Sequence, residues 1–99
     1  MRVRLIPKAE SQLLALPGPA AARVADALRL LGAAPRSGHA YPDDSPFQGL
    51  HYKTIVVRAR RWSYRVTYEL RGHELWVLFI APSWYPVTHA DLGSADEDE

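Results

Sequence analysis

Two kinds of hydrophobic spacing divide the chain into predicted strands and predicted helices. Residues 62–70, WSYRVTYEL, carry an aromatic or aliphatic side chain at every second position and a polar side chain between them. Successive side chains of a β-strand point to opposite faces, so this alternation predicts a strand with one face in the core and the other face open. Further strands are predicted over residues 2–6, 50–57 and 74–81.

The segment from Lys8 to Leu31 has helical spacing instead. A first apolar stripe ends at Leu16, where a Pro-Gly-Pro run follows and terminates the helix. A second stripe lies within residues 20–31, where Pro19 suits the first turn of the helix and Gly32 suits its end. The sequence therefore predicts a hairpin of two short helices.

Proline, glycine and aspartate interrupt the chain between these helices and the later strands. Residues 33–49 contain too many of them for a regular element, so we predict a long loop, a feature that is often functional or mobile. Gly72 can take the positive φ of a tight hairpin between the last two strands. The predicted order is β-α-α-β-β-β, an α+β fold in which an antiparallel sheet carries the helical hairpin on the face of Trp62, Tyr64 and Tyr68.

The composition limits the classes of protein that remain. A chain of 99 residues has room for one hydrophobic core, and we predict a single domain over residues 1–90. The absence of cysteine excludes thiolate metal ligands and a cysteine nucleophile, and the four histidines show no ligand spacing, so no metal and no cofactor is predicted. No apolar run approaches the ~18 residues of a membrane span and no signal peptide is evident, which predicts a cytoplasmic protein without membrane contact.

Charge is distributed unevenly along the chain. Five of the eleven acidic residues lie in the last nine positions, so residues 1–90 carry twelve basic and six acidic side chains. Such a block of like charge predicts a disordered, solvated tail over residues 91–99. The alternative is that the tail folds over the basic surface as a mimic of the substrate.

The basic side chains concentrate in residues 50–71. This stretch has a single acidic residue, Glu69, against six basic ones: Lys53, Arg58, Arg60, Arg61, Arg65 and Arg71. A charge density of this kind attracts a phosphate backbone, which makes nucleic acid the first predicted partner. Arg65 lies on the open face of its strand, where the alternative to a functional role is a salt bridge with Glu69. Lys53 alternates in phase with Ile55, and we expect it to share the open surface with Arg65.

Three motifs carry a resemblance to a known family. They are Phe47-Gln48-Gly49-Leu50, then Tyr52-Lys53, then Tyr64-Arg65-Val66-Thr67-Tyr68-Glu69 followed by an apolar strand. In this layout the chain resembles the RelE/ParE superfamily of bacterial type II toxins. The resemblance implies a toxin neutralised by a cognate antitoxin. In the RelE branch, which we favour, the toxin inhibits translation as a ribosome-dependent endoribonuclease that cleaves messenger RNA without a metal.

Two alternatives remain beside the endoribonuclease. The ParE branch inhibits DNA gyrase and requires no proton transfer. A catalytically weakened toxin would instead persist as the antitoxin-binding component of a repressor. The adjacent reading frame would reveal an antitoxin gene without choosing among the targets.

The resemblance also implies roles for individual residues. Arg65 matches the strand arginine that holds the scissile phosphate, and Lys53 matches a strand lysine near the attacking 2′-hydroxyl. After the last strand the family places a further arginine and a tyrosine, or a histidine and a tyrosine. Here no arginine stands there, and Tyr85 and His89 are the candidate catalytic residues. These side chains could supply the base, the acid and the cations that metal-independent cleavage needs.

The remaining predicted contacts bind RNA without taking part in catalysis. Arg58, Arg60 and Arg61 crowd one turn, where three like charges repel one another and contribute little to the fold, so we predict contact with the RNA backbone. Trp84 is predicted to stack on a base.

Overall fold

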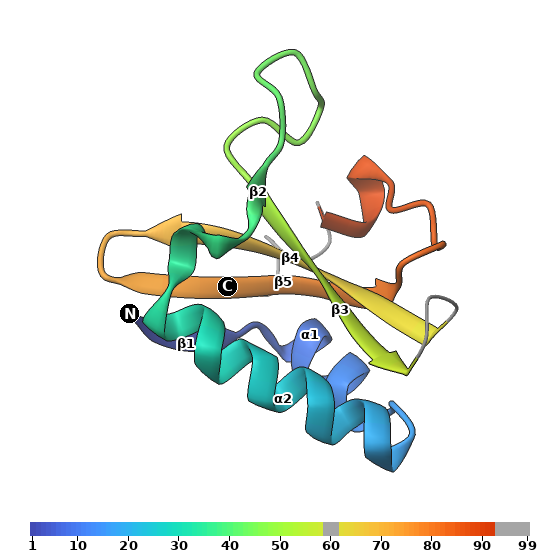
Figure 1. The fold of residues 1–99 in the computed structure, drawn as a ribbon. Coiled ribbons are helices and arrows are strands. Elements are labelled where there is room, and N and C mark those ends of the chain that lie inside the picture. The colour runs from blue at the N-terminus through green and yellow to red at the C-terminus, as the bar shows by residue number, and fades with distance from the viewer. Residues whose placement is uncertain (59–61, 93–99) are drawn as a thin grey trace.

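The protein is an α+β domain built on one mixed five-stranded sheet. The computed structural model describes residues 1–58 and 62–92, so Arg60, Arg61 and residues 93–99 of the predicted tail lie outside the described residues. Two α-helices lie on one side of the sheet, while the long loop before β3 and the C-terminal segment stand on the other (Figure 1). The elements are β1 (Arg2–Leu5), α1 (Pro7–Leu14), α2 (Gly18–Ala33), the 3-10 helix η1 (Pro35–Ser37), β2 (His39–Ala40), β3 (His51–Arg58), β4 (Trp62–Arg71) and β5 (Glu74–Pro82).

Both predicted helices are confirmed. Each has a proline in its first turn, where the missing N–H costs no helical hydrogen bond. Ala9 of α1 and Val24 and Leu28 of α2 are buried, which confirms the apolar stripes that the spacing predicted. Among the described residues, no helix is both long enough and apolar enough to cross a membrane.

The helices cover one face of the sheet, as predicted for the strand of residues 62–70, but the other face is partly covered too, since Thr67 and Phe79 on it are buried. In an antiparallel pair, residues directly opposite each other share a face. Tyr64 of β4 stands opposite Ile55 of β3, and both are buried with Val66 and Tyr68 in one core together with α2. We call this the helix face and the other side, which carries Arg65, the open face. The hairpin between β4 and β5 turns at Gly72, whose φ of 59° is positive as predicted.

The sheet is mixed rather than antiparallel, which corrects the predicted fold at its first strand. The strand order is β1-β5-β4-β3-β2, and β1 pairs with β5 in parallel, with Arg2 beside Glu74 and Leu5 beside Val77. Alternation of side chains identifies a strand but not its partner, and the partner decides the direction. The predicted long loop also contains β2, a two-residue strand that pairs with β3.

Tyr68 joins the loop after α2 to the centre of the sheet. Its side chain is fully buried, and its hydroxyl donates a hydrogen bond of 3.0 Å to the carbonyl oxygen of Pro35. Burial raises the pKa of Tyr68 above its ordinary value of 10.0, and the backbone of Gly38 partly offsets this. The folded chain therefore holds this phenol in its neutral form more strongly than the unfolded chain does.

We expect Tyr68→Phe to weaken the protein at neutral pH and to reduce its sensitivity to alkali. The lost hydrogen bond costs about 1 kcal/mol of the free energy of unfolding. Above pH ~10 the unfolded wild type releases the Tyr68 proton while the folded wild type retains it, so stability falls as pH rises toward the folded pKa. Urea unfolding of both proteins from about pH 8 to 11 should show the advantage of the wild type shrinking above pH ~10. A constant difference between the two proteins would contradict this.

Candidate nucleic-acid interface

The open face is a hydroxyl-bearing and cationic surface with raised edges. Residues of β3 and β4 that point away from the helices form its floor, in which Thr54 is exposed and Arg65 partly exposed, whereas Ser63 and Thr67 are buried. Residues 41–50 rise on one side of it and the segment after β5 on the other (Figure 1). A ligand lying across this floor would therefore meet side chains from the sheet, from residues 41–50 and from the segment after β5.

Arg65 occupies the middle of this floor. Its guanidinium carbon lies 4.7 Å from the centre of the Tyr52 ring, within the range of a cation–π contact. Its Nε is buried and has no hydrogen-bond partner among the described residues. The alternative ion pair is not formed, because Glu69 binds Arg71 instead. Arg65 is therefore held by an aromatic ring while a donor of its guanidinium remains unused.

A series of aromatic rings leads away from Arg65. The ring centres of Tyr52 and Tyr41 are 4.9 Å apart, those of Tyr41 and Phe47 are 5.1 Å apart, and those of Phe47 and His89 are 6.2 Å apart. These separations fall within the range of aromatic pairs. Unpaired RNA bases bind proteins largely by stacking on such rings. The rings thus extend the cationic site toward the C-terminal segment.

Hydroxyl groups surround Arg65 on the same face. The Oγ atoms of Ser63 and Ser83 are 2.6 Å apart, and the Ser83 N–H donates to the Ser63 carbonyl oxygen at 3.0 Å. Thr67 is buried, and its Oγ1 has no partner among the described residues. A buried polar atom without a partner is unusual, so the hydrogen-bonding capacity of this hydroxyl is unused within the described residues.

The C-terminal segment is fixed by a capping arrangement. The Thr88 N–H donates to the Asp91 carboxylate at 2.9 Å, and the Asp91 N–H donates to the Thr88 hydroxyl at 3.4 Å. The hydrogen bonds from Thr88 hold the pKa of Asp91 below its usual range. The helical turn of residues 89–92 follows, with His89 beside Phe47 and Leu92 buried. Two residues of the predicted tail therefore make defined contacts: Asp91 is bonded to Thr88 and Lys8, and Leu92 is buried.

Tyr85 lies in the same segment as His89. Its ring centre is 5.8 Å from that of Phe79, a residue of the open face of β5, and its hydroxyl is 3.5 Å from the Asp91 carboxylate. The Lys8 ammonium lies 5.2 Å from the Phe79 ring and donates to the Asp91 carbonyl oxygen at 3.0 Å. Tyr85 and His89, the two candidates for proton transfer, thus lie on the same side of the sheet as Arg65.

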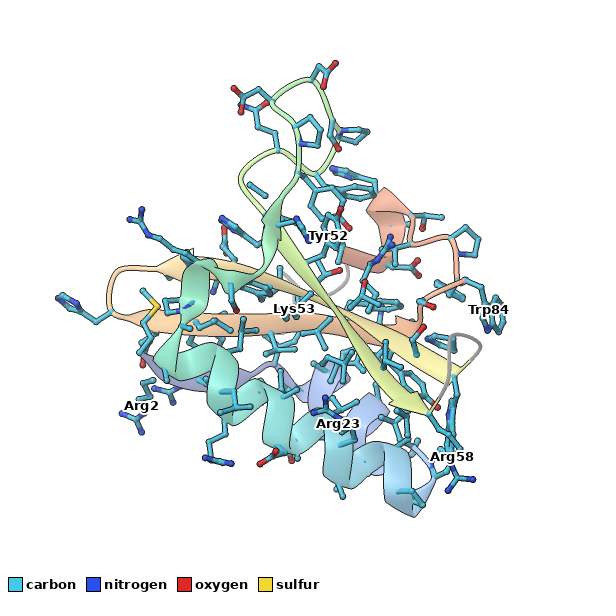
Figure 2. The ribbon with its side chains drawn as sticks, in the orientation of Figure 1. Arg2, Arg23, Tyr52, Lys53, Arg58 and Trp84 are labelled. Atoms are coloured by element: carbon cyan, nitrogen blue, oxygen red, sulfur yellow. The ribbon has the colours of Figure 1, made fainter. Side chains whose placement is uncertain are left out.

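Lys53 lies on the other side of the sheet, contrary to our expectation. It stands directly opposite Val66 on the helix face, and its ammonium donates to the Ser37 carbonyl oxygen at 3.2 Å. Arg65 stands opposite Thr54 on the open face. Figure 2 labels both Lys53 and Tyr52, which are neighbours along β3. Of the two, Tyr52 belongs to the open face. Alternation within β3 correctly separated the side chains on its two faces. Only the register between β3 and β4 shows which of these side chains share a face with Arg65 of β4.

The other predicted RNA contacts lie at the margin of the molecule. Arg58 is exposed at the end of β3, and Trp84, in the turn after β5, is 76% exposed (Figure 2). Arg60 and Arg61 lie outside the described residues, so their predicted role stays a prediction. The structure therefore brings Arg65, Tyr85 and His89 to one side of the sheet. The aromatic residues Tyr41, Tyr52 and Phe47 were not predicted to belong to the site.

Neither a metal cluster nor a known relative defines the site further. In residues 1–58 and 62–92, no three side chains of His, Cys, Asp or Glu are grouped so that they could hold a metal ion. No family model, no curated protein and no solved structure matches the chain. The resemblance to the RelE/ParE superfamily stays a prediction that rests on the three sequence motifs.

Proposed function

We propose that this protein is the toxin of a type II toxin–antitoxin module and cleaves messenger RNA on the ribosome, thereby inhibiting translation. The observation that carries the proposal is the state of Arg65. Its guanidinium lies on the open face beside the Tyr52 ring, the side chain is partly exposed, and its buried Nε has no partner among the described residues. A phosphate oxygen is the acceptor that best suits such a guanidinium. The cognate antitoxin is the second partner that this proposal implies.

The cleavage proposed here is an internal transesterification of RNA. The ribose 2′-oxygen forms a bond to phosphorus while the bond from phosphorus to the 5′-oxygen breaks. A base accepts the 2′ proton, and an acid gives a proton to the departing 5′-oxygen. Arg65 would stabilise the negative charge that builds on the phosphate oxygens. Tyr85 and His89 are the candidates for proton transfer because they border the face that carries Arg65.

A ParE-like inhibitor of DNA gyrase is the second candidate function. One observation favours it: Lys53 lies on the helix face and cannot act with Arg65 on one phosphate. A protein that only binds gyrase has no need of a lysine near a 2′-hydroxyl. The same open face would then serve as a binding surface and not as a catalytic one.

Primer extension on cellular messenger RNA after induction separates these functions when gyrase supercoiling is assayed in parallel. We expect new cleavage ends within reading frames and unchanged supercoiling. Lys53→Met should cleave as well as the wild type, because it changes only the helix face. Inhibited supercoiling without cleavage would support the gyrase inhibitor instead. Loss of cleavage by Lys53→Met at equal soluble expression would show that the site is not confined to the open face.

A further inference from the structure

A small cavity of about 170 Å³ opens beside the aromatic rings of the open face. It lies between the loop before β3 and the C-terminal turn, and Leu78 and Leu92, both buried, belong to its lining. Sites for drug-sized ligands begin at roughly 300 Å³. This cavity is therefore suited to a single flat ring system and not to a whole nucleotide.

We propose that this cavity is a subsite for one RNA base and that it selects bases carrying an amino group. The inference rests on the proposed function, since it takes single-stranded RNA as the ligand of the open face. Phe47 and His89 both line the cavity, and their rings are inclined by only 18° to each other. They form an aromatic wall on which a base can stack, as unpaired bases do on proteins.

Glu69 supplies the polar selection in the cavity. Its side chain is 33% exposed, and its Oε1 accepts a hydrogen bond from the Nε of Arg71. An ionised carboxylate accepts hydrogen bonds at about four positions and donates none, so acceptor capacity remains for a ligand. No lysine or arginine belongs to the lining of the cavity in the part of the chain that the structure describes, so a phosphate would meet a carboxylate and no lining cation. The cavity therefore favours a base and leaves the phosphates to Arg65.

The four RNA bases differ in what they offer to a carboxylate. Adenine, cytosine and guanine each carry an amino donor, whereas uracil carries a carbonyl oxygen where cytosine has its amino group. That oxygen and the carboxylate are both acceptors, and the N3–H of uracil, its remaining donor on this edge, lies between two carbonyl oxygens, so uracil fits poorly. Glu69 follows Arg65 by four residues, or ~13 Å along a strand. The selected base therefore belongs to a nucleotide near the one whose phosphate Arg65 holds, and not to that nucleotide itself.

Binding of two RNA hexamers tests this selection. Hexacytidylate and hexauridylate differ in their bases chiefly by the amino group and carbonyl oxygen at one position. We expect the full-length wild type to bind hexacytidylate roughly tenfold more tightly, as one well-placed hydrogen-bonded contact to a base edge allows. Glu69→Gln should remove this preference, because the new amide can donate to the uracil carbonyl.

Glu74→Gln is the matched control for Glu69→Gln. Glu74 is similarly exposed, at 30%, and forms an ion pair with Arg4, but it does not line the cavity. The control should keep the preference for hexacytidylate. Equal loss of preference in both variants would overturn the proposal, as would equal affinity of the wild type for the two hexamers.

Two further measurements keep this proposal separate from the proposed function. Phe47→Leu removes a stacking ring and should weaken binding of hexacytidylate, which remains testable if Glu69→Gln fails to fold. Unchanged binding by Phe47→Leu would overturn the subsite. Cleavage of messenger RNA by a wild type without base preference would refute the subsite alone. A Glu69-dependent preference without any cleavage would refute the endoribonuclease alone.

Discussion

Replacing Arg65 by alanine is expected to abolish messenger RNA cleavage and growth inhibition while the protein stays folded. The arginine lies on the open face, so its removal leaves the core on the helix face intact. The loss of the cation–π contact with Tyr52 costs about 1 kcal/mol of stability. Loss of a group that stabilises charge in the transition state lowers the cleavage rate by roughly a hundredfold or more.

Arg4→Ala provides the matched control for Arg65→Ala. Arg4 also lies over an aromatic ring, 5.2 Å from the centre of Trp76, but it belongs to the edge strand β1. Both variants remove one positive charge and one cation–π contact. Thermal unfolding, growth inhibition and primer extension at equal soluble expression should therefore separate them. If Arg65→Ala remains as toxic as Arg4→Ala, the role assigned to Arg65 is wrong.

Gly38→Ala is expected to cause a large loss of stability by crowding the Tyr68 hydroxyl and the backbone of β3. A Cβ at residue 38 would overlap the Tyr68 hydroxyl oxygen and would lie 2.8 Å from the Tyr52 carbonyl oxygen. The second atom belongs to the backbone of β3 and cannot move alone. We expect about 2 kcal/mol of destabilisation, a fall in Tm of ~10 °C, and weaker activity because Tyr52 supports Arg65.

Gly18→Ala tests whether this effect comes from crowding. Gly18 begins α2, and a Cβ there would have nothing within 4 Å. Alanine there reduces the entropy of the unfolded chain, which raises stability by as much as ~1 kcal/mol, and the helical conformation before Pro19 offsets part of this gain. Differential scanning calorimetry should show Tm falling for Gly38→Ala and unchanged or rising for Gly18→Ala. A Tm of Gly38→Ala equal to that of the wild type would contradict the close packing of Tyr68 against the segment of residues 35–38.

The parts of the fold that depend on neighbouring residues could be predicted from the sequence. Alternation in residues 62–70 separated Tyr64 and Tyr68 from Arg65, because side-chain direction in a strand is a local property. Pro19 and Gly72 marked a helix start and a hairpin, because each restricts its own backbone. These features need no knowledge of distant contacts.

The remaining features depend on pairing between distant residues. The position of Lys53 follows from its register with Val66, and the direction of β1 follows from its pairing with β5. The contact of Arg65 with Tyr52 needs the same register. The cluster of Tyr41, Phe47 and His89 joins a loop rich in proline and glycine to the C-terminal turn, and periodicity carries no information about such contacts.

The pairing of β1 with β5 also has a consequence for the synthesis of this protein. β1 is synthesised first, but its partner β5 is the last strand in the sequence. Arg2 therefore cannot pair with Glu74 until nearly all of the chain has been made. Ile6 and Ala9 belong to the same core as Val77 and Ile80 and stay partly solvated until then. Contacts of such long sequence separation slow folding, because the entropy of closing the intervening chain is lost before they form. A nascent chain that ends before β5 therefore cannot complete the sheet, and the face that carries Arg65 is assembled only after β5 has been synthesised.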